Sequence, residues 1–520
     1  MSNSNSSAGA VRRTYGNWRR ARGFGIGTLS STETKVVFTA LVVPALVAIG
    51  SGRAALVLAV VGAVAVAVTV VKIDGQSITG LLARRLRFHR AQRAGWTELS
   101  GGLLTEHPRR HDLPGPLAPV VPLSTDDGRG GRQGLLWDRR TGTLTAVLRV
   151  SPVGLDLIDR AQADTWVAQW GAFLADLGYQ PMIRHVSVTV DTSPTGGTTL
   201  RDDVTARLDP AAPAAARAVM AALAAAAPSS AAEVTTYVAL CFDPSRATPR
   251  PPDLPAAVAE VTRWLPGTER ALSATGVAVL GRATTRWLTD HLRAAYDPAA
   301  RPDLAATAAA AAAGAAGGDG GGVPPGSSQH PASGWAAEWA AEWADAAPIR
   351  ARESWDHWRH DSGISVSWAM IDAPRQAVMD RILAPLLAPG PFARRTTLLY
   401  TPFNAATAAA EVEREITHTH IRRSWARKTK RDETQRDRDD LARAVQTARE
   451  EAEGAGLGRF TLYATTTVTD QTLLPAAVAD CEQRAGHSKL RLRRLGGAHT
   501  AGFAAALGLG VNPDELHHRH

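Results

Sequence analysis

The stretch VVFTALVVPALVAIGSGRAALVLAVVGAVAVAVTVV, from Val36 to Val71, decides how the rest of the chain is placed. It consists of two apolar runs, Val36–Ile49 and Ala54–Val71, separated by the polar turn Gly50–Arg53. The second run has 18 residues and no charge. A helix of that length spans about 27 Å, close to the hydrocarbon thickness of a bilayer. We therefore predict a transmembrane helical hairpin over residues 35–72, with a buried soluble helix pair as the alternative.

Basic residues flank both ends of this hairpin. Because lysine and arginine are retained on the cytoplasmic side, we expect an inner-membrane protein with two transmembrane helices and both termini in the cytoplasm. A cleaved signal peptide is not expected, because a polar leader of more than thirty residues comes first and a second apolar run follows at once. The residues predicted to flank the membrane are Arg12, Arg13, Trp18, Arg19, Arg20 and Lys35 on the N-terminal side and Lys72, Arg84, Arg85 and Arg87 on the C-terminal side.

The composition places the positive charge near the membrane. The 520 residues carry a net charge of +9, and the excess lies within residues 11–110. Anionic lipid therefore explains the basic balance better than nucleic acid, which is not expected as a direct ligand. Cys241 and Cys481 are isolated in sequence, which argues against a disulfide scaffold and against a thiolate zinc site.

The predicted fold class is α+β. The alternation of strand and helix patterns after the hairpin indicates two cytoplasmic α+β units of the ferredoxin-like type, and their similar element order suggests an internal duplication. We divide the chain into a basic juxtamembrane N-terminus (1–34), the hairpin (35–72), a basic amphipathic and irregular connector (73–133), a first α+β domain (134–302), a flexible Ala/Gly/Pro-rich linker (303–334), a second α+β domain with a long charged helix (335–510) and a tail (511–520).

Motifs for nucleotide chemistry are missing from the sequence. A P-loop requires Gly-Lys-Ser/Thr after its glycines, and the chain contains no Gly-Lys pair. Neither a nucleophile elbow nor a dinucleotide-binding glycine motif occurs at a strand-to-helix turn. We predict no catalytic, cofactor-binding or metal-binding residues. The alternative is a membrane-tethered enzyme using His357, His360 and Asp361, whose two histidines share one face if this stretch is helical.

A long charged segment, residues 405–453, is predicted to be helical. One part of it carries six cations without an intervening acid: Arg422, Arg423, Arg427, Lys428, Lys430 and Arg431. A solvated helix stabilised by ion pairs four residues apart explains this pattern. The functional alternative is an arm that docks a partner protein. Nucleic acid is less favoured, because only Trp425 is available there to stack on bases.

Several strings together resemble an actinobacterial family of membrane proteins encoded near conjugation genes. They are Thr14-Tyr15-Gly16-Asn17-Trp18-Arg19-Arg20, Trp166-Val167-Ala168-Gln169-Trp170-Gly171, Ala295-Tyr296-Asp297-Pro298 and the run from Trp355 to Gly363. The resemblance implies a hairpin similar to the small PrgI-type membrane component of type IV secretion. It also implies a cytoplasmic part similar to the non-catalytic N-terminal region of the VirB-family secretion ATPase. It carries over no catalytic residues.

The leading hypothesis is a membrane-anchored, non-catalytic scaffold that recruits a separate P-loop ATPase to a conjugation or type IV secretion-like apparatus. Its expected partners are the membrane and the proteins of that apparatus, in a homo- or hetero-oligomer without cofactors. The alternative is an EccE-like component of the type VII (ESX) secretion translocon, which also has two N-terminal membrane helices before a cytoplasmic body. The enzyme alternative requires a deep pocket around the His357–Asp361 stretch.

Overall fold

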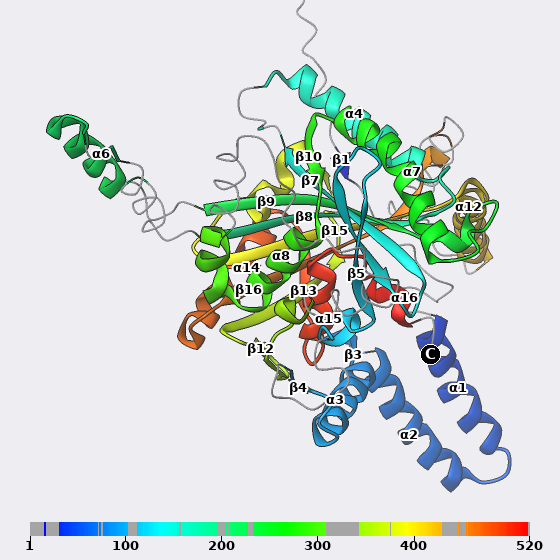
Figure 1. Ribbon diagram of the computed structural model, residues 1–520. Coiled ribbons are helices and arrows are strands. Elements are labelled where there is room, and N and C mark those ends of the chain that lie inside the picture. The colour runs from blue at the N-terminus through cyan, green and yellow to red at the C-terminus, as the bar shows by residue number, and fades with distance from the viewer. Residues whose placement is uncertain are drawn as a thin grey trace, which may run out of the picture.

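The fold is mixed α and β, built around one large antiparallel sheet (Figure 1). The computed structural model describes residues 15–16, 31–70, 72–73, 76–101, 112–152, 154, 158–194, 204, 208–209, 211–226, 232–307, 343–374, 376–428, 445–447, 449, 454 and 456–517. Within these residues, thirteen strands share the large sheet, and two short strand pairs, β1–β14 and β2–β3, lie outside it.

The bounds of the elements follow chain order. The first half contains β1 (Tyr15–Gly16), α1 (Ser31–Val47), α2 (Gly52–Val70), β2 (Lys72–Ile73), β3 (Gln76–Ser77), α3 (Ile78–Arg93), β4 (Glu98–Ser100), β5 (Val120–Asp126), β6 (Arg132–Asp138), β7 (Thr143–Pro152), α4 (Arg160–Leu177), β8 (Ile183–Pro194), α6 (Ala214–Ala226), β9 (Ala232–Phe242), α7 (Leu254–Ser273), β10 (Val277–Arg282) and α8 (Thr285–Tyr296). The second half contains β11 (Arg350–Glu353), β12 (Trp358–His360), β13 (Gly363–Asp372), β14 (Ala377–Val378), α11 (Ala384–Leu387), β15 (Ala393–Pro402), α12 (Ala405–Lys428), β16 (Gly458–Val468), α14 (Leu474–His487), β17 (Arg491–Arg494), α15 (His499–Ala506) and α16 (Pro513–His517).

Each half contains a βαββαβ arrangement, the ferredoxin-like type. In the first half, α4 connects β7 to β8 and α7 connects β9 to β10, and the strands lie in the order β10-β7-β9-β8. In the second half, α11 and α14 occupy the corresponding connections, and the order is β17-β13-β16-β15. A hairpin extends each unit: β5–β6 pairs with β7, and β11–β12 pairs with β13.

The two units join through their second strands, so that the predicted domains are halves of one sheet. β8 and β15 pair antiparallel, with Thr189 opposite Thr397, and the two hydroxyl groups lie 2.9 Å apart. Beside this pair, Arg395 donates to the buried carboxylate of Asp191 at 2.7 Å. Because β8 and β15 are equivalent strands of the two units, their pairing relates the units by a local two-fold axis at the centre of the sheet.

A repeated sequence marks the same relation. Residues 254–259 read Leu-Pro-Ala-Ala-Val-Ala, and residues 474–479 read the same. They open α7 and α14, the two helices that occupy equivalent connections. Both helices are followed by a residue with positive φ, Gly276 at 81° and Lys489 at 54°. These observations support the internal duplication that the element order suggests.

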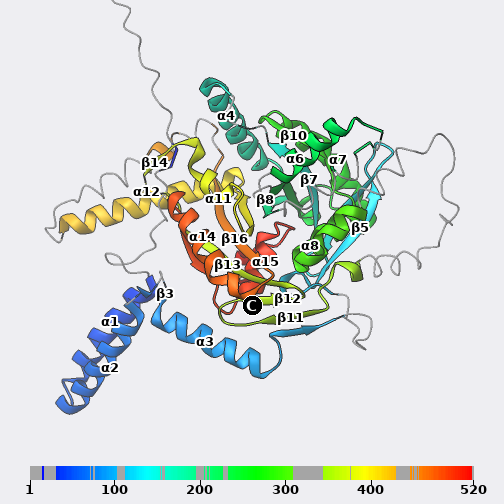
Figure 2. The same ribbon diagram turned by 90° about the vertical axis from the view of Figure 1, so that its left-hand side faces the viewer.

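Helices cover both faces of the sheet. In the first half, alternate residues of β9 point in opposite directions: Val238 and Leu240 pack with α4 and α7, whereas Tyr237 and Ala239 pack with α8 and α15. This alternation with a period of two is what a strand buried on both sides produces. Figure 2 shows the helices of the second half, α11 and α14, against their part of the sheet.

Three local predictions are wrong. Residues 100–134 were expected to be irregular, but they contain β5 and the start of β6, and β4 pairs with β11. The predicted boundary at residue 134 therefore divides a strand. The sequence of residues 375–387 predicts one helix, but β14 and a 3₁₀ turn come before the short α11, which begins at Ala384. The stretch 357–360 is strand β12 and the loop before it, so its two histidines do not share a helix face.

The two apolar runs form helices α1 and α2, which lie side by side away from the body (Figures 1 and 2). By length and composition, one described helix is able to cross a membrane, over Gly52–Thr69 in α2. The first run gives the shorter apolar segment Lys35–Val47, which contains Pro44. A second spanning helix therefore stays a prediction.

Candidate functional site

A groove of about 640 Å³ lies between the β5–β6 turn and α7. This volume falls in the range of about 300–1,000 Å³ that is typical of ligand-binding sites. Six of its thirteen lining residues are apolar: Leu123 from β5, and Leu254, Pro255, Val258, Ala259 and Pro266 from α7. Thr125, Asp126, Asp127, Gly128, Arg129, Thr262 and Arg263 complete the lining. We call this site the α7 groove.

The turn that walls the groove is held by its own carboxylates. Asp127 accepts hydrogen bonds from the backbone N–H groups of Arg129 at 2.7 Å and Gly131 at 2.9 Å. These bonds, the one from Arg129 first, hold the pKa of the Asp127 carboxyl below its usual range. Asp126 accepts from the N–H of Gly128 at 2.6 Å. Gly128 has a φ of 75°, a conformation that glycine adopts without steric cost.

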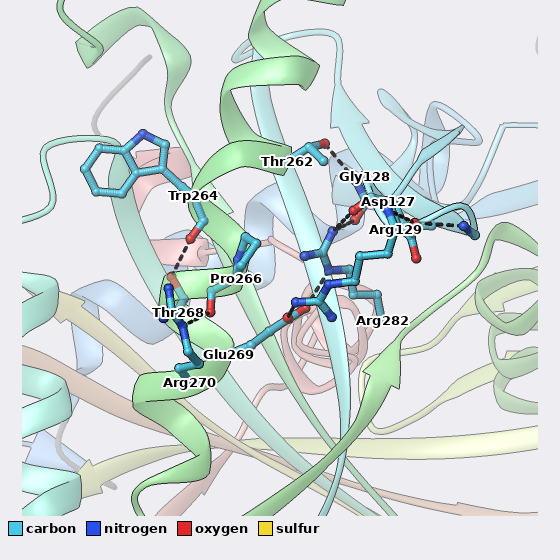
Figure 3. Close-up of polar contacts among 12 residues, drawn as sticks. Asp127, Gly128, Arg129, Thr262, Trp264, Pro266, Thr268, Glu269, Arg270 and Arg282 are labelled. Atoms are coloured by element: carbon cyan, nitrogen blue, oxygen red, sulfur yellow. Dashed lines mark hydrogen bonds and ion pairs between the residues drawn. The ribbon is translucent and has the colours of Figure 1, made fainter.

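A charge cluster, in which Glu269 and Arg282 are buried and Arg129 is exposed, ties this turn to α7 and β10 (Figure 3). Glu269 of α7 binds Arg282 of β10 at 2.5 Å and Arg129 of the turn at 2.7 Å. Arg282 also donates to the carbonyl of Asp127 at 3.0 Å and to the side chain of Gln133 at 2.8 Å. Because both arginines converge on one carboxylate with 9% exposure, the turn has a fixed position over the helix.

The chemistry of the groove favours binding over catalysis. None of its described lining residues is a histidine, cysteine, serine, lysine or tyrosine, and the Asp127 carboxylate is already engaged with the backbone of the turn. Among the described residues, no group of three or more His, Cys, Asp or Glu side chains is arranged to hold a metal ion. An apolar lining beside a polar wall suits an apolar segment of a protein.

Of the two histidines behind the enzyme alternative, His357 is half-buried in the loop before β12, whereas His360 is held in the interior. His360 is fully buried. Its Nδ1 donates to the carbonyl of Tyr296 at 2.6 Å, and its Nε2 lies 2.7 Å from the Ser365 hydroxyl. Burial lowers the pKa of His360 to about 4, so the ring is neutral. Asp361 binds Arg293 at 2.9 Å. These residues connect α8 to the second unit.

Two of the predicted membrane-flanking arginines face the protein. Arg84 donates to the carbonyl of Gly496 at 2.7 Å, and the Arg85 guanidinium lies 4.8 Å from the ring centre of Trp355. Phe88, on the same helix α3, is buried with its ring 5.5 Å from that of Trp355. Helix α3 is therefore docked on the second unit. Lys35 and Arg87 are exposed on α1 and α3.

Most of the remaining predicted site residues fall outside the described part of the chain. Arg12, Arg13, Trp18, Arg19, Arg20, Lys430 and Arg431 lie there. The side chains of Lys72 in β2 and of Arg422, Arg423, Arg427 and Lys428 in α12 also lie outside it. The N-terminal basic group and the predicted docking cations therefore stay predictions.

The α7 groove was missed from the sequence, although one signal for it exists. The string Asp126-Asp127-Gly128-Arg129-Gly130-Gly131 contains an Asp-Gly pair between two apolar runs, which is a hairpin signal. Its glycines are also typical of irregular chain. For the other wall, α7, the sequence predicts a helix over residues 254–275.

Comparison with known proteins finds no matching family model and no curated protein with significant similarity.

Proposed function

We propose that this chain is a membrane-anchored, non-catalytic scaffold of a conjugation or type IV secretion-like apparatus, which recruits a separate ATPase at the cytoplasmic face. The observation that carries the proposal is the apolar surface of α2. Leu56, Val57 and Val60 are 69%, 61% and 59% exposed, and between Gly52 and Thr69 the described side chain of Ala55 alone is buried. A helix that is apolar all round and not covered by protein is suited to lipid.

In this proposal α1 and α2 enter the bilayer together as a hairpin, with both ends in the cytoplasm. Their close contact supports the pairing. A Cβ atom added at Gly62 of α2 would lie 3.1 Å from the Cβ of Ala40 in α1, so the absence of a side chain lets the two helices approach closely. The body then lies beneath the membrane, attached through α3.

Two observations support the recruitment of a separate ATPase: the missing P-loop and the presence of a body with a groove. The sequence has no P-loop lysine, whereas the body offers two docked βαββαβ units and the α7 groove, which are features of a platform. The resemblance to conjugation-associated membrane proteins points to a secretion motor as the partner. An EccE-like role in type VII secretion is the second candidate, and the identity of neighbouring genes separates the two.

The proposal is tested by purifying tagged protein from membranes in mild detergent. We expect a P-loop ATPase to be recovered with the full chain, in a complex larger than a monomer. A matched control that ends at Ser100 retains the hairpin and α3 but lacks the body, and it should recover no ATPase. Recovery of the full chain as a lone monomer, or equal recovery of the ATPase with both chains, would contradict the proposal.

A further inference from the structure

Helix α6 carries an apolar face that its own chain does not cover. It lies in the connection between β8 and β9 and stands away from the sheet (Figure 1). Every side chain from residue 213 to residue 223 is exposed. Val219, Met220 and Leu223 are 58%, 45% and 61% exposed, and their spacing places them on one side of the helix. We call this helix the α6 arm.

The α7 groove presents the complementary surface. Leu254, Val258 and Ala259 leave an apolar channel along α7. The α6 arm has 13 residues, so its length is about 20 Å. A single apolar helix face laid along an apolar groove is a recurrent mode of protein recognition.

The α7 groove lies beside the longer of the two related hairpins. In the first unit, β5 and β6 have seven residues each, and their turn reaches over α7. In the second unit, β11 and β12 have four and three residues. Ala479 of α14, the counterpart of Ala259 in the repeated Leu-Pro-Ala-Ala-Val-Ala string, is exposed and lines neither described pocket. The longer β5–β6 hairpin therefore gives the first unit a groove wall that the shorter β11–β12 hairpin does not provide in the second unit.

Charge agrees with this pairing. Arg217 is the one charged residue between Ala214 and Ala226, and it flanks the apolar face of the arm. The turn beside the groove presents Asp126 and Asp127. The two cations of the lining, Arg129 and Arg263, are already paired with Glu269 and Glu260. An arm lying in the groove would bring its single positive charge to an acidic wall.

We propose that the α6 arm of one copy docks in the α7 groove of a second copy. The arm and the groove lie at opposite ends of the molecule in Figure 1, so this contact joins two different surfaces. Such head-to-tail contacts produce a closed ring or an open chain, according to the rotation between copies. The inference concerns self-association and does not rest on the proposed ATPase partner.

Disulfide trapping in membranes tests this contact. Two full-length chains with tags of different size are co-expressed, one carrying Leu223→Cys and the other Ala259→Cys. The native thiols Cys241 and Cys481 are each 1% exposed, so they give a low background. Mild oxidation should produce a covalent dimer that contains both tags, and Val219→Asp added to the first chain should reduce its yield at least tenfold.

The matched control replaces Ala259→Cys with Ala479→Cys, the same position in the repeated string of the second unit. Its yield of mixed dimer should also be at least tenfold lower. Equal yields for the two cysteine positions would overturn the proposal, as would a product that is insensitive to Val219→Asp. A double variant, Leu223→Cys with Ala259→Cys, that forms its disulfide only within one chain would overturn it as well.

Discussion

Buried histidines make the body sensitive to acid at the level of single residues. Burial lowers the pKa of His291 to about 3, and burial also lowers the pKa values of His360 and His499 to about 4. A pKa that is lower in the folded state means that the unfolded chain binds the proton first as pH falls. The contribution of the neutral histidines to the free energy of unfolding is therefore complete above about pH 6.5, and it is lost as the pH falls toward 4.

His360→Gln should reveal one part of this dependence. Because the variant loses the buried hydrogen bonds to Tyr296 and Ser365, its free energy of unfolding at pH 8 should fall by about 1–3 kcal/mol. Between pH 6.5 and 4 the free energy of unfolding of the variant should fall less steeply with pH than that of the parent. The two slopes should differ by at most about 1.4 kcal/mol per pH unit. Denaturant unfolding in detergent at a series of pH values measures both quantities.

The matched control for this experiment is His89→Gln, because His89 is exposed on α3. This variant should follow the pH dependence of the parent. If His360→Gln and His89→Gln showed the same slope below pH 6.5, the neutral buried state of His360 would be refuted.

At the scale of elements, α3 is the joint between the apolar helices and the body. The face of α3 that carries Phe88 packs against the ring of Trp355 and the backbone of Gly497. A Cβ atom added at Gly497 would lie 2.9 Å from the Phe88 ring. Arg84 and Arg85 add polar and cation–π contacts to the same loops. The helix begins at an N-cap serine, Ser77, whose side chain accepts from the N–H of Gly80 at 3.3 Å.

Phe88→Ala should release this joint. Truncating a buried phenylalanine costs about 3 kcal/mol or more, which corresponds to an increase of roughly 100-fold in the population of the undocked helix. Trypsin should therefore cleave within Arg84–Arg93 much faster in the variant than in the parent protein. Leu86→Ala, on the same helix but 61% exposed in the parent, should leave the cleavage rate unchanged. Equal rates for the two variants would contradict the docked position.

The elements that the sequence predicted well are those with a strong period. The alternating run 185–191 is part of β8, and the capped amphipathic run after Ser77 is α3. The β5–β6 hairpin was missed because its glycine-rich turn and Pro122 resemble irregular chain. The Asp-Gly pair of the turn was a local signal for one wall of the α7 groove. The meeting of the two walls could not be predicted, since residues such as Gln133 and Thr262, which share a hydrogen bond, are 129 positions apart.

At the scale of the whole molecule, the β8–β15 pairing makes one body of two related units. The seam contains the Thr189–Thr397 hydrogen bond and the Asp191–Arg395 ion pair. Both carboxylate and guanidinium are nearly fully buried, with 4% and 6% side-chain exposure. Breaking such a pair leaves an uncompensated buried charge, at a cost of about 3–5 kcal/mol. The element order suggested this duplication, but nothing in the local sequence indicated which strands meet.

Cleavage between the units tests the seam. A protease site inserted between residues 314 and 330, within the linker predicted from the sequence, allows the chain to be cut between the two units. We expect the two fragments to stay together in mild detergent and to separate only in denaturant, because the strand pairing does not depend on the connection. An uncut chain with the same insertion is the control. Separation of the fragments immediately after cleavage would show that the seam does not hold the halves together.

In the function that we propose, a hairpin places the whole body beneath the membrane. A membrane-impermeant thiol reagent measures this directly, since both native cysteines are buried. Ser51→Cys lies in the turn between α1 and α2, and Arg250→Cys lies on the exposed surface of the body. We predict that Ser51→Cys is labelled in intact cells and that Arg250→Cys is labelled only after the membrane is permeabilised. Labelling of both positions in intact cells, or of neither before permeabilisation, would contradict the account.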